Sequence, residues 1–563
     1  MSIEKNRRRQ PQKGAGRSRV ATVSRQHPEA GSEQVLWNAQ GQPPVTVQPS
    51  DPVSRIVPGK DEVLFLPLGG CSRIGMNMAL YGHDGKWLIV DAGVAFVGDE
   101  FPGIEALLAD PAFIEERMAD VVALVVTHAH EDHIGAIHHL WPRLRCPIYA
   151  SPFAAHIIRD RLKETNALRQ VDLQVLPIGS RIKLGPFDVE SIAVTHSIPE
   201  PTSLAIRTRA GTVLHTGDWK LDPDPLIGLT TDTEALTRLG DEGLLAMMCD
   251  STNADVEGTT GSEAVARDGL MAAFANATGA IAVTGFASNV ARMTAVVEAA
   301  RANDRKVVLV GRSMLRMEKA ARACGYLDAL PDFISIQEAA WTERRNLVFL
   351  CTGSQGEERA ALSRLARDNH RDLWLEAGDR VVFSARVIPG NEEVLQSVKD
   401  HLVSKGIEIV TPADAPVHVS GHPKRDDLRR MYAMTRPRFA VPVHGTIPHM
   451  EAHARLARDC GVERALVPED GDIVRLAKEG TAVIGHIEPK RLANDGRNIF
   501  SWTGPLEPPE LLKPVSIDEA GVDAAMGAAN SRNPGKGARG RGAGRSKFRR
   551  AGKSSRSQSV MAA

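Results

Sequence analysis

Short apolar runs recur along the chain and alternate with longer stretches of mixed character. Runs of four to seven apolar residues lie near 62–68, 86–91, 121–126 and 244–249, and hairpin-like runs lie near 187–217. Runs of this length are typical of buried strands. The pattern predicts a strand-rich unit of the α/β class in the first half of the chain.

The middle of the chain has a different spacing of apolar runs. The apolar runs 280–284, 306–310 and 347–350 are separated by stretches with helical periodicity, such as 290–302 and 356–369. Continuous apolar strands that alternate with helices are typical of a parallel sheet that is covered on both faces. We therefore expect a second α/β unit here, and the strand-rich pattern returns from about residue 407.

A dense group of metal-ligand side chains follows the run 121–126. The pattern HxHxDH places three imidazoles and one carboxylate within six residues, at His128, His130, Asp132 and His133. A tight loop can turn them toward two neighbouring points, and nitrogen and oxygen ligands suit Zn²⁺. An isolated histidine would more often be an ordinary surface or core residue. Four ligand-type residues so close together favour half of a two-metal site.

Three more candidate ligands follow strand-like runs elsewhere. They are His196, Asp218 and His444, and Gly217 before Asp218 allows a tight turn where its strand ends. Each is weak evidence alone, because Thr-Gly-Asp is also an ordinary turn. Their order along the chain and their shared placement make the set much stronger.

These residues resemble a known family. The HxHxDH pattern and the three later ligands are similar to those of metallo-β-lactamase hydrolases, with Asp91 as their first motif. Other segments resemble β-CASP nucleases and, within them, bacterial ribonuclease J. Those segments are Cys249–Ala254, Thr284–Asn289, Cys351–Glu357, Phe383–Glu392 and His418–His422. The resemblance covers roughly residues 60–478.

The resemblance implies an α/β fold, namely an αββα metallo-β-lactamase sandwich with an inserted α/β β-CASP domain and disordered basic termini. The lactamase domain is expected in two parts, 58–255 and 405–478, with the β-CASP domain at 256–404. The flanking segments are a basic N-terminal extension (1–57), a short C-terminal remnant or linker (479–530) and an Arg/Gly-rich tail (531–563).

The resemblance also implies two Zn²⁺ ions per chain. One is expected on His128, His130 and His196, the other on Asp132, His133 and His444, with Asp218 as the bridging ligand. Asp91 and Asp250 are expected to orient histidine ligands. The implied catalytic residues are His422, Asp132, Asp218 and His444, with His422 contacting the scissile phosphate and protonating the leaving 3′-oxygen.

A second set of residues is expected to bind RNA. By resemblance, the 5′-monophosphate pocket comprises His418, Ser420, Gly421 and His422, while Gly353, Ser354 and Gln355 hold the RNA backbone. A hydroxyl beside a glycine suits this role, because a small residue exposes backbone N–H groups to phosphate oxygens. The alternative is a purely structural role, in which His418 and Ser420 form hydrogen bonds at a strand end and do not bind phosphate.

Two features depart from the family. Arg73 stands in the Gly69–Gly75 loop about where an acidic residue is usual. The C-terminal domain that usually assists dimerisation is also reduced to about fifty residues before the basic tail. Val483–Ile487 could form one strand of a remnant, but the Pro-rich stretch 505–514 argues against a full domain.

Composition sets broad limits. A chain of 563 residues with 42% hydrophobic content can bury two or more cores. Its six cysteines show no paired spacing, which suits reduced thiols in a cytoplasm. No run approaches the ~20 apolar residues of a membrane span, and the N-terminus lacks an apolar signal region. We expect a cytoplasmic protein with no membrane segment.

The net charge of zero hides a strong asymmetry. Residues 1–28 hold eight Lys or Arg against one acid, and residues 531–563 hold ten against none, so the segment between them is acidic. Such basic, Gly- and Ser-rich arms are expected to be disordered and to attract RNA through its phosphates, without reading sequence. A merely solubilising tail is the alternative.

The resemblance thus implies a zinc-dependent ribonuclease in rRNA processing and mRNA decay. We expect 5′→3′ exonuclease activity on single-stranded 5′-monophosphate RNA, together with endonuclease activity. Partners beyond RNA would be a second copy of the chain or an RNA-decay complex. Two alternatives remain: a β-CASP nuclease acting on DNA or other RNA substrates, and a catalytically inactive RNA-binding homologue.

Overall fold

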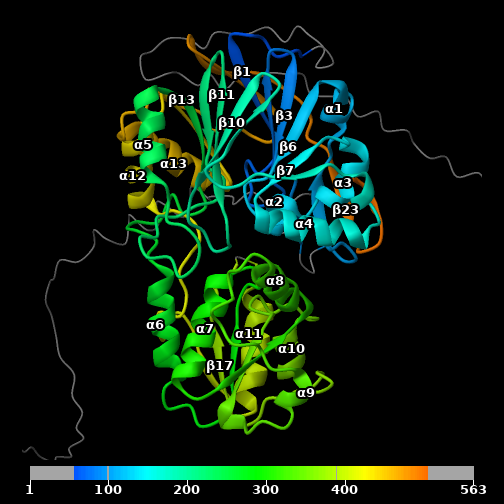
Figure 1. The fold of residues 1–563 in the computed structure, drawn as a ribbon, viewed down its shortest axis with the longest axis vertical. Helices are drawn as coiled ribbons and strands as arrows, with labels where there is room; N and C mark the ends of the chain where they lie inside the picture. The colour runs from blue at the N-terminus through cyan, green and yellow to red at the C-terminus, as the bar shows by residue number, and fades with distance from the viewer. Residues whose placement is uncertain (1–55, 98–100, 389, 505–563) are drawn as a thin grey trace, which may run out of the picture. The chain divides into compact units, whose positions relative to one another are not determined.

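The structure is a computed structural model that describes residues 56–97, 101–388 and 390–504 (Figure 1). The predicted disorder of the basic N-terminal extension and tail therefore lies outside the described residues, apart from residues 56 and 57. Among the described residues, no helix is both long and apolar enough to span a membrane.

Two sheets face each other in the lactamase part. The first has eight strands in the order β22-β21-β1-β2-β3-β6-β7-β8. They are β1 (Glu62–Gly69), β2 (Met78–His83), β3 (Lys86–Val90), β6 (Val121–Val125), β7 (Ile148–Ala150), β8 (Leu173–Val175), β21 (Asp472–Ala477) and β22 (Gly480–His486). The second sheet has seven strands in the order β20-β19-β13-β12-β11-β10-β9. They are β9 (Arg181–Leu184), β10 (Phe187–Ala193), β11 (Thr202–Thr208), β12 (Gly211–His215), β13 (Leu244–Asp250), β19 (Phe439–Val443) and β20 (Arg464–Ala465).

The inner faces of these sheets form one apolar core. Phe65 and Tyr81 of the first sheet pack in the same cluster as Phe187, Met248 and Phe439 of the second, and none is more than 1% exposed. Burial of such area is the main favourable term in folding. It explains why the two sheets stack, and with them their strand ends.

Helices cover the outer faces of both sheets. Figure 1 shows α1, α3 and α4 outside the first sheet, and α5, α12 and α13 outside the second. These helices, with the short α2, are α1 (Ala112–Glu115), α2 (Glu131–Ile134), α3 (Ile137–Leu144), α4 (Pro152–Glu164), α5 (Thr233–Glu242), α12 (Arg425–Thr435) and α13 (Ile447–Asp459). The layering confirms the predicted αββα sandwich.

The inserted unit is built on a parallel sheet of five strands, in the order β15-β16-β14-β17-β18. They are β14 (Ile281–Thr284), β15 (Lys306–Val310), β16 (Leu347–Cys351), β17 (Arg380–Phe383) and β18 (Glu408–Val410). The helices around it are α6 (Glu263–Phe274), α7 (Val290–Ala302), α8 (Arg312–Ala323), α9 (Ile336–Ala339), α10 (Ala361–Ala366) and α11 (Glu392–Ser404). The predicted parallel sheet is confirmed.

Two details of this unit differ from the sequence pattern. The helix predicted at 356–369 is shorter in the structure, where only α10 forms. Gly356 has a positive φ of 82°, and its N–H donates to the carbonyl oxygen of Gly353 in a turn, so residues before α10 are not helical. In addition, β18 pairs with β17 and lies beyond the boundary predicted at residue 404.

The segment after residue 478 is integrated into the lactamase part. β22, expected as a single strand of a remnant, pairs with β21. A further sheet has the order β24-β23-β5-β4 and joins β23 (Arg491–Asn494) and β24 (Ile499–Trp502) to β5 (Ala106–Ala109) and β4 (Val94–Phe96). The described end of the chain therefore contributes strands to two sheets of the lactamase part.

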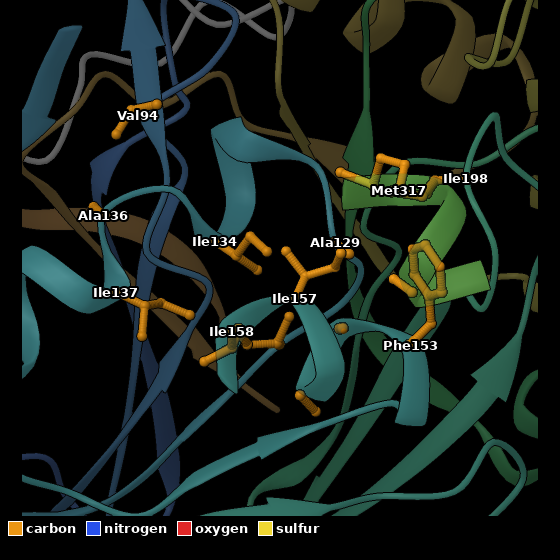
Figure 2. Close-up of a cluster of buried hydrophobic side chains, with 14 of the residues drawn as sticks. Val94, Ala129, Ile134, Ala136, Ile137, Phe153, Ile157, Ile158, Ile198 and Met317 are labelled. Atoms are coloured by element: carbon orange, nitrogen blue, oxygen red, sulfur yellow. The ribbon is translucent and has the colours of Figure 1, made fainter. Parts of the chain in front are cut away.

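Helix α4 supports the loop that carries the HxHxDH pattern. Figure 2 shows Ala129 and Ile134, both within that loop region, beside Ile157 and Ile158 of α4. All four are at most 4% exposed. Ala129, between two candidate ligands, and Ile134, directly after the last one, thus anchor the segment on α4.

We expect Phe187→Ala to destabilise the sandwich by about 3–5 kcal/mol, since it opens a cavity between the two sheets. Phe96→Ala is the matched control, because Phe96 is 70% exposed. Thermal and denaturant unfolding of both variants checks the prediction. Equal stability of the two variants would contradict the assignment of this core.

Candidate metal centre

The loop after β6 is fixed by a buried aspartate. Asp91 follows β3, and its carboxylate accepts hydrogen bonds from the Thr127 backbone N–H and hydroxyl, both at 2.8 Å. Gly93 is needed nearby, because a Cβ there would lie 1.6 Å from the carbonyl oxygen of Asp132. The ends of β3 and β6 are thereby locked together beneath the histidine motif.

The first predicted ligand set converges. His128 Nε2 and His196 Nε2 each lie 3.1 Å from His130 Nδ1. Asp218 Oδ2 lies 3.7 Å from His128 Nε2 and 3.8 Å from His196 Nε2. The ligand atoms of these four residues all lie within 4.8 Å of one another, which suits one cation.

The second predicted set converges beside the first. His444 Nε2 lies 3.1 Å from Asp132 Oδ2, and His133 Nε2 lies 3.2 Å from Asp218 Oδ2. Asp218 reaches His444 through its other oxygen, at 3.6 Å from Nδ1. The atoms of Asp132, His133, Asp218 and His444 again lie within 4.8 Å of one another. Asp218 therefore belongs to both sets, as a bridging ligand must.

Several ligand rings are held from behind. His133 Nδ1 lies 2.8 Å from Asp91 Oδ2, and His196 Nδ1 lies 2.6 Å from the carbonyl oxygen of Gly421. Such partners fix the tautomer, so that the opposite ring nitrogen presents a lone pair. A side chain at Gly421 would lie 2.6 Å from the His196 ring, which explains the glycine at that position.

Asp250 holds a further histidine, His422, next to the two sets. Its Oδ2 lies 2.8 Å from His422 Nδ1, and its Oδ1 accepts from the Thr252 backbone N–H and hydroxyl. The Thr252 hydroxyl is also 3.0 Å from His444 Nδ1. The predicted orienting residues Asp91 and Asp250 thus both contact histidines of the cluster, and His422 stacks on His444 with ring centroids 5.5 Å apart.

The electrostatics of the two sets differ. Burial lowers the pKa of His128 and His196, and lowers that of His130 to about 4, so these rings are neutral as metal binding requires. In the second set, burial is outweighed by carboxylates, chiefly Asp218. They raise the pKa of His133 and raise that of His444 to about 10.

Both carboxylates remain ionised, although Asp218 is buried and Asp132 is partly buried. Burial would raise the pKa of Asp132 and Asp218, but the surrounding imidazoles hold both well below the usual range. Buried negative charge on converging oxygens and imidazole nitrogens calls for cations. The side chains of both sets therefore fit two divalent metal ions.

The residues expected to bind RNA fall into two groups. Ser420 is close to the cluster, because its Oγ accepts from Asn253 Nδ2, which also donates to the carbonyl of His422. His418 Nδ1 is buried without a hydrogen-bond partner. Among the described residues, the second group, at 353–355, forms no hydrogen bond to the candidate metal ligands.

Residues 353–355 hold and pack against neighbouring segments. Gln355 donates from Nε2 to the Arg386 carbonyl and accepts from the Ile388 N–H, so it holds the loop after β17. A Cβ on Gly353 would lie 2.9 Å from Leu362. The loop held by Gln355 reaches the site through Arg386, whose Nη1 donates to Asn253 Oδ1 at 2.8 Å.

Several contributors were not foreseen from the sequence. Thr127, Thr252, Asn253 and Asn77 all hydrogen-bond to site residues. Thr127 directly precedes the HxHxDH motif, and Thr252 and Asn253 lie in the recognised segment Cys249–Ala254, so proximity to a motif was the available signal. Asn77 had none, because its partner Asp132 lies 55 residues away.

Comparison with known proteins agrees with this geometry. Residues 75–246 match the metallo-beta-lactamase superfamily, residues 278–402 match the ribonuclease J beta-CASP domain, and residues 415–468 match the Zn-dependent metallo-hydrolase RNA specificity domain. A ribonuclease J from Sinorhizobium meliloti is 44% identical over 77% of this chain and 78% of its own length. The chain belongs to the ribonuclease J family.

Other relatives support the same placement. The ribonuclease J of Mycolicibacterium smegmatis is 42% identical over 76% of this chain and 77% of its own length. A crystal structure of an Enterococcus faecalis protein of unknown function covers 74% of this chain and all of its own, with a TM-score of 0.51 and 17% identity. That likeness concerns the fold alone. Membership of the family makes the chain a nuclease of the metallo-hydrolase class.

We expect acidification to remove metal from the second set before the first. Since the pKa values of His133 and His444 are raised, protons compete for those nitrogens over a wider pH range than for His128, His130 and His196. Metal content after equilibrium dialysis over a pH series checks this order. Simultaneous loss of both equivalents, or loss from the first set alone, would contradict it.

Proposed function

We propose that this protein is a two-zinc ribonuclease that degrades single-stranded RNA from a 5′-monophosphate end in the 5′→3′ direction and also cleaves internally. The observation that carries the proposal is the pair of ligand sets sharing Asp218, with His422 beside them. The nitrogen and oxygen donor set favours Zn²⁺. When bound, two such ions supply hydroxide at neutral pH and neutralise charge on the reacting phosphate.

His422 is suited to act as the general acid. The pKa of its imidazole is raised, because burial is outweighed by Asp250 at 2.8 Å and by Asp218. The raised pKa favours the protonated ring, with Nδ1 engaged by Asp250 and Nε2 left to donate to a leaving 3′-oxygen. General acids of this kind typically contribute about 10²–10⁴-fold.

The ligand side chains have defined tasks in this proposal. His128, His130 and His196 hold one ion, and the second set holds the other, while Asp91 keeps the ring of His133 in place. Asp250 has a double task, because it binds His422 directly and His444 through Thr252. It thus ties the general acid to a metal ligand.

A 5′-phosphate pocket at 418–422 is supported by two observations. His418 has a buried ring nitrogen without a partner, and buried polar atoms normally have one. The Ser420 oxygen accepts from Asn253, which leaves its own proton to donate to a phosphate. Gly421 contributes by admitting the His196 ring. For Gly353, Ser354 and Gln355 we propose an indirect contribution to RNA binding through the loop that carries Arg386.

The cellular role follows from the same proposal. A 5′→3′ ribonuclease of this kind serves rRNA processing and mRNA decay in the cytoplasm, as a homodimer or within an RNA-decay complex. Matched RNA and DNA oligonucleotides separate it from a β-CASP nuclease that acts on DNA. An inactive RNA-binding homologue would bind RNA without cleaving it.

We expect 5′-monophosphorylated RNA to be degraded faster than the same RNA with a 5′-triphosphate, since the pocket at His418 and Ser420 should hold one phosphate. End-labelled single-stranded RNA in both 5′ states is the substrate, and Ser420→Ala should reduce the preference. Equal rates on the two substrates would remove the pocket. Comparable cleavage of matched DNA would favour the alternative nuclease.

Removal of residues 531–563 should weaken RNA binding and flatten its salt dependence, because ten positive charges are lost. Metal content should be unchanged. Binding measured at several salt concentrations, for the full chain and the truncated one, tests this. Identical binding curves would leave the tail a solubilising role only.

A further inference from the structure

Asn77, in the loop between β1 and β2, reaches the second ligand set with its side chain. Its Nδ2 lies 2.9 Å from the carbonyl oxygen of Asp132, 3.3 Å from Asp132 Oδ2 and 3.0 Å from His133 Nε2. Two of these three partners are the atoms that Asp132 and His133 would offer to a metal ion. Asn77 belongs to neither ligand set, so these contacts come in addition to those that the ligands make with one another.

The chemistry of the partners fixes how the amide is oriented. A carbonyl oxygen can only accept, so the amide group facing Asp132 must be the NH₂ end. One N–H is thereby committed to the main chain of Asp132. The second N–H lies between Asp132 Oδ2 and His133 Nε2. Once a metal ion occupies the lone pair of His133, the carboxylate is the acceptor that remains for this N–H.

The surroundings of Asn77 are shaped to hold the amide there. The Asn77 backbone N–H donates to the same Asp132 carbonyl at 3.0 Å, and its C=O accepts from Gly93. On the other side, a Cβ on Gly70 would lie 2.4 Å from Asn77 Oδ1. The glycine therefore leaves the space that the amide oxygen needs.

Gly70 links the same loop to the third residue of the set. Its carbonyl accepts the His444 backbone N–H at 2.7 Å. The 70–77 loop thus contacts Asp132 and His133 through Asn77, and His444 through Gly70. Each of these contacts falls on the second set, and the side-chain hydrogen bonds of Asn77 do not reach His128, His130 or His196.

We propose that Asn77 is a positioning residue for the second metal ion, which it serves by donating hydrogen bonds to Asp132. The inference rests on the two-metal function proposed above. It also gives the loop a role that does not depend on position 73, where Arg replaces the acidic residue usual in the family. Partners in this position typically change metal affinity by about 10–100-fold.

The test is a metal titration of the full chain with Asn77→Ala and Asn77→Leu. Leu has a branched shape close to that of Asn but cannot donate, so it separates hydrogen bonding from packing. Asn303→Ala is the matched control, because Asn303 also donates to a main-chain carbonyl, that of Ala299, away from the cluster. Zn²⁺ binding is measured by competition with a chromophoric chelator, and Co²⁺ spectra report the ligand environment.

We expect wild type and the Asn303 control to bind two equivalents tightly. Both Asn77 variants should bind the first equivalent normally and the second about 10–100-fold more weakly, with a changed spectrum for the second Co²⁺ only. Should Asn77→Ala fail to fold, Asn77→Leu still provides the comparison.

Two outcomes would overturn the inference: unchanged affinity for both equivalents, or equal weakening of both. Normal binding by Asn77→Leu alone would assign the effect to packing and also overturn it. A wild-type protein that binds no metal and cleaves no RNA would instead refute the proposed function, so the two failures are distinguishable.

Discussion

A single buried carboxylate connects the two halves of the candidate metal centre. Asp218 is 3% exposed, and its oxygens lie 3.2–3.8 Å from nitrogens of both ligand sets. An isolated buried charge is costly, so this position is stable only when cations or protonated imidazoles surround it. The rest of the lactamase part can be understood as the framework that brings those partners to Asp218.

The framework works because ligands follow strand ends. Asp91 and the HxHxDH loop follow β3 and β6 of the first sheet, while Asp218 and His444 follow β12 and β19 of the second. The shared apolar core fixes the two sheets face to face, so loops at one edge must meet. Apolar packing of the two sheets, which has no role in the reaction itself, thereby sets the distances between the candidate ligand atoms.

Sequence patterns located many of the strands and the candidate ligands, but they missed short strands such as β2, β7 and β8. Periodicity located 306–310 as a strand and 290–302 as a helix, because both bury continuous apolar surface. The ligands were found because histidines and aspartates at strand ends form a recognisable series. Motif resemblance also marked Asp250 and His422, whose side chains are 2.8 Å apart although 172 residues separate them.

Hydrogen-bond partners were harder to predict than ligands. Gly421 was expected to expose its N–H to phosphate, yet the structure shows that it admits the His196 ring and accepts from it. The role of Gln355 in holding RNA stays a prediction, and the structure adds that its amide fastens a neighbouring loop. Glycine and glutamine are common at loop positions for many reasons. Only the folded structure shows which neighbouring residue each of them contacts.

The dependence on Asp218 can be measured directly with Asp218→Asn, which keeps the shape of the side chain and removes its charge. The account predicts two metal equivalents and RNA cleavage for wild type, with fewer than two tightly bound equivalents and a cleavage rate reduced by at least about 10²-fold for the variant. Metal analysis and RNA degradation on the same samples provide both values. An Asp218→Asn protein that retains two metal ions and cleaves RNA at the wild-type rate would contradict the shared-carboxylate account.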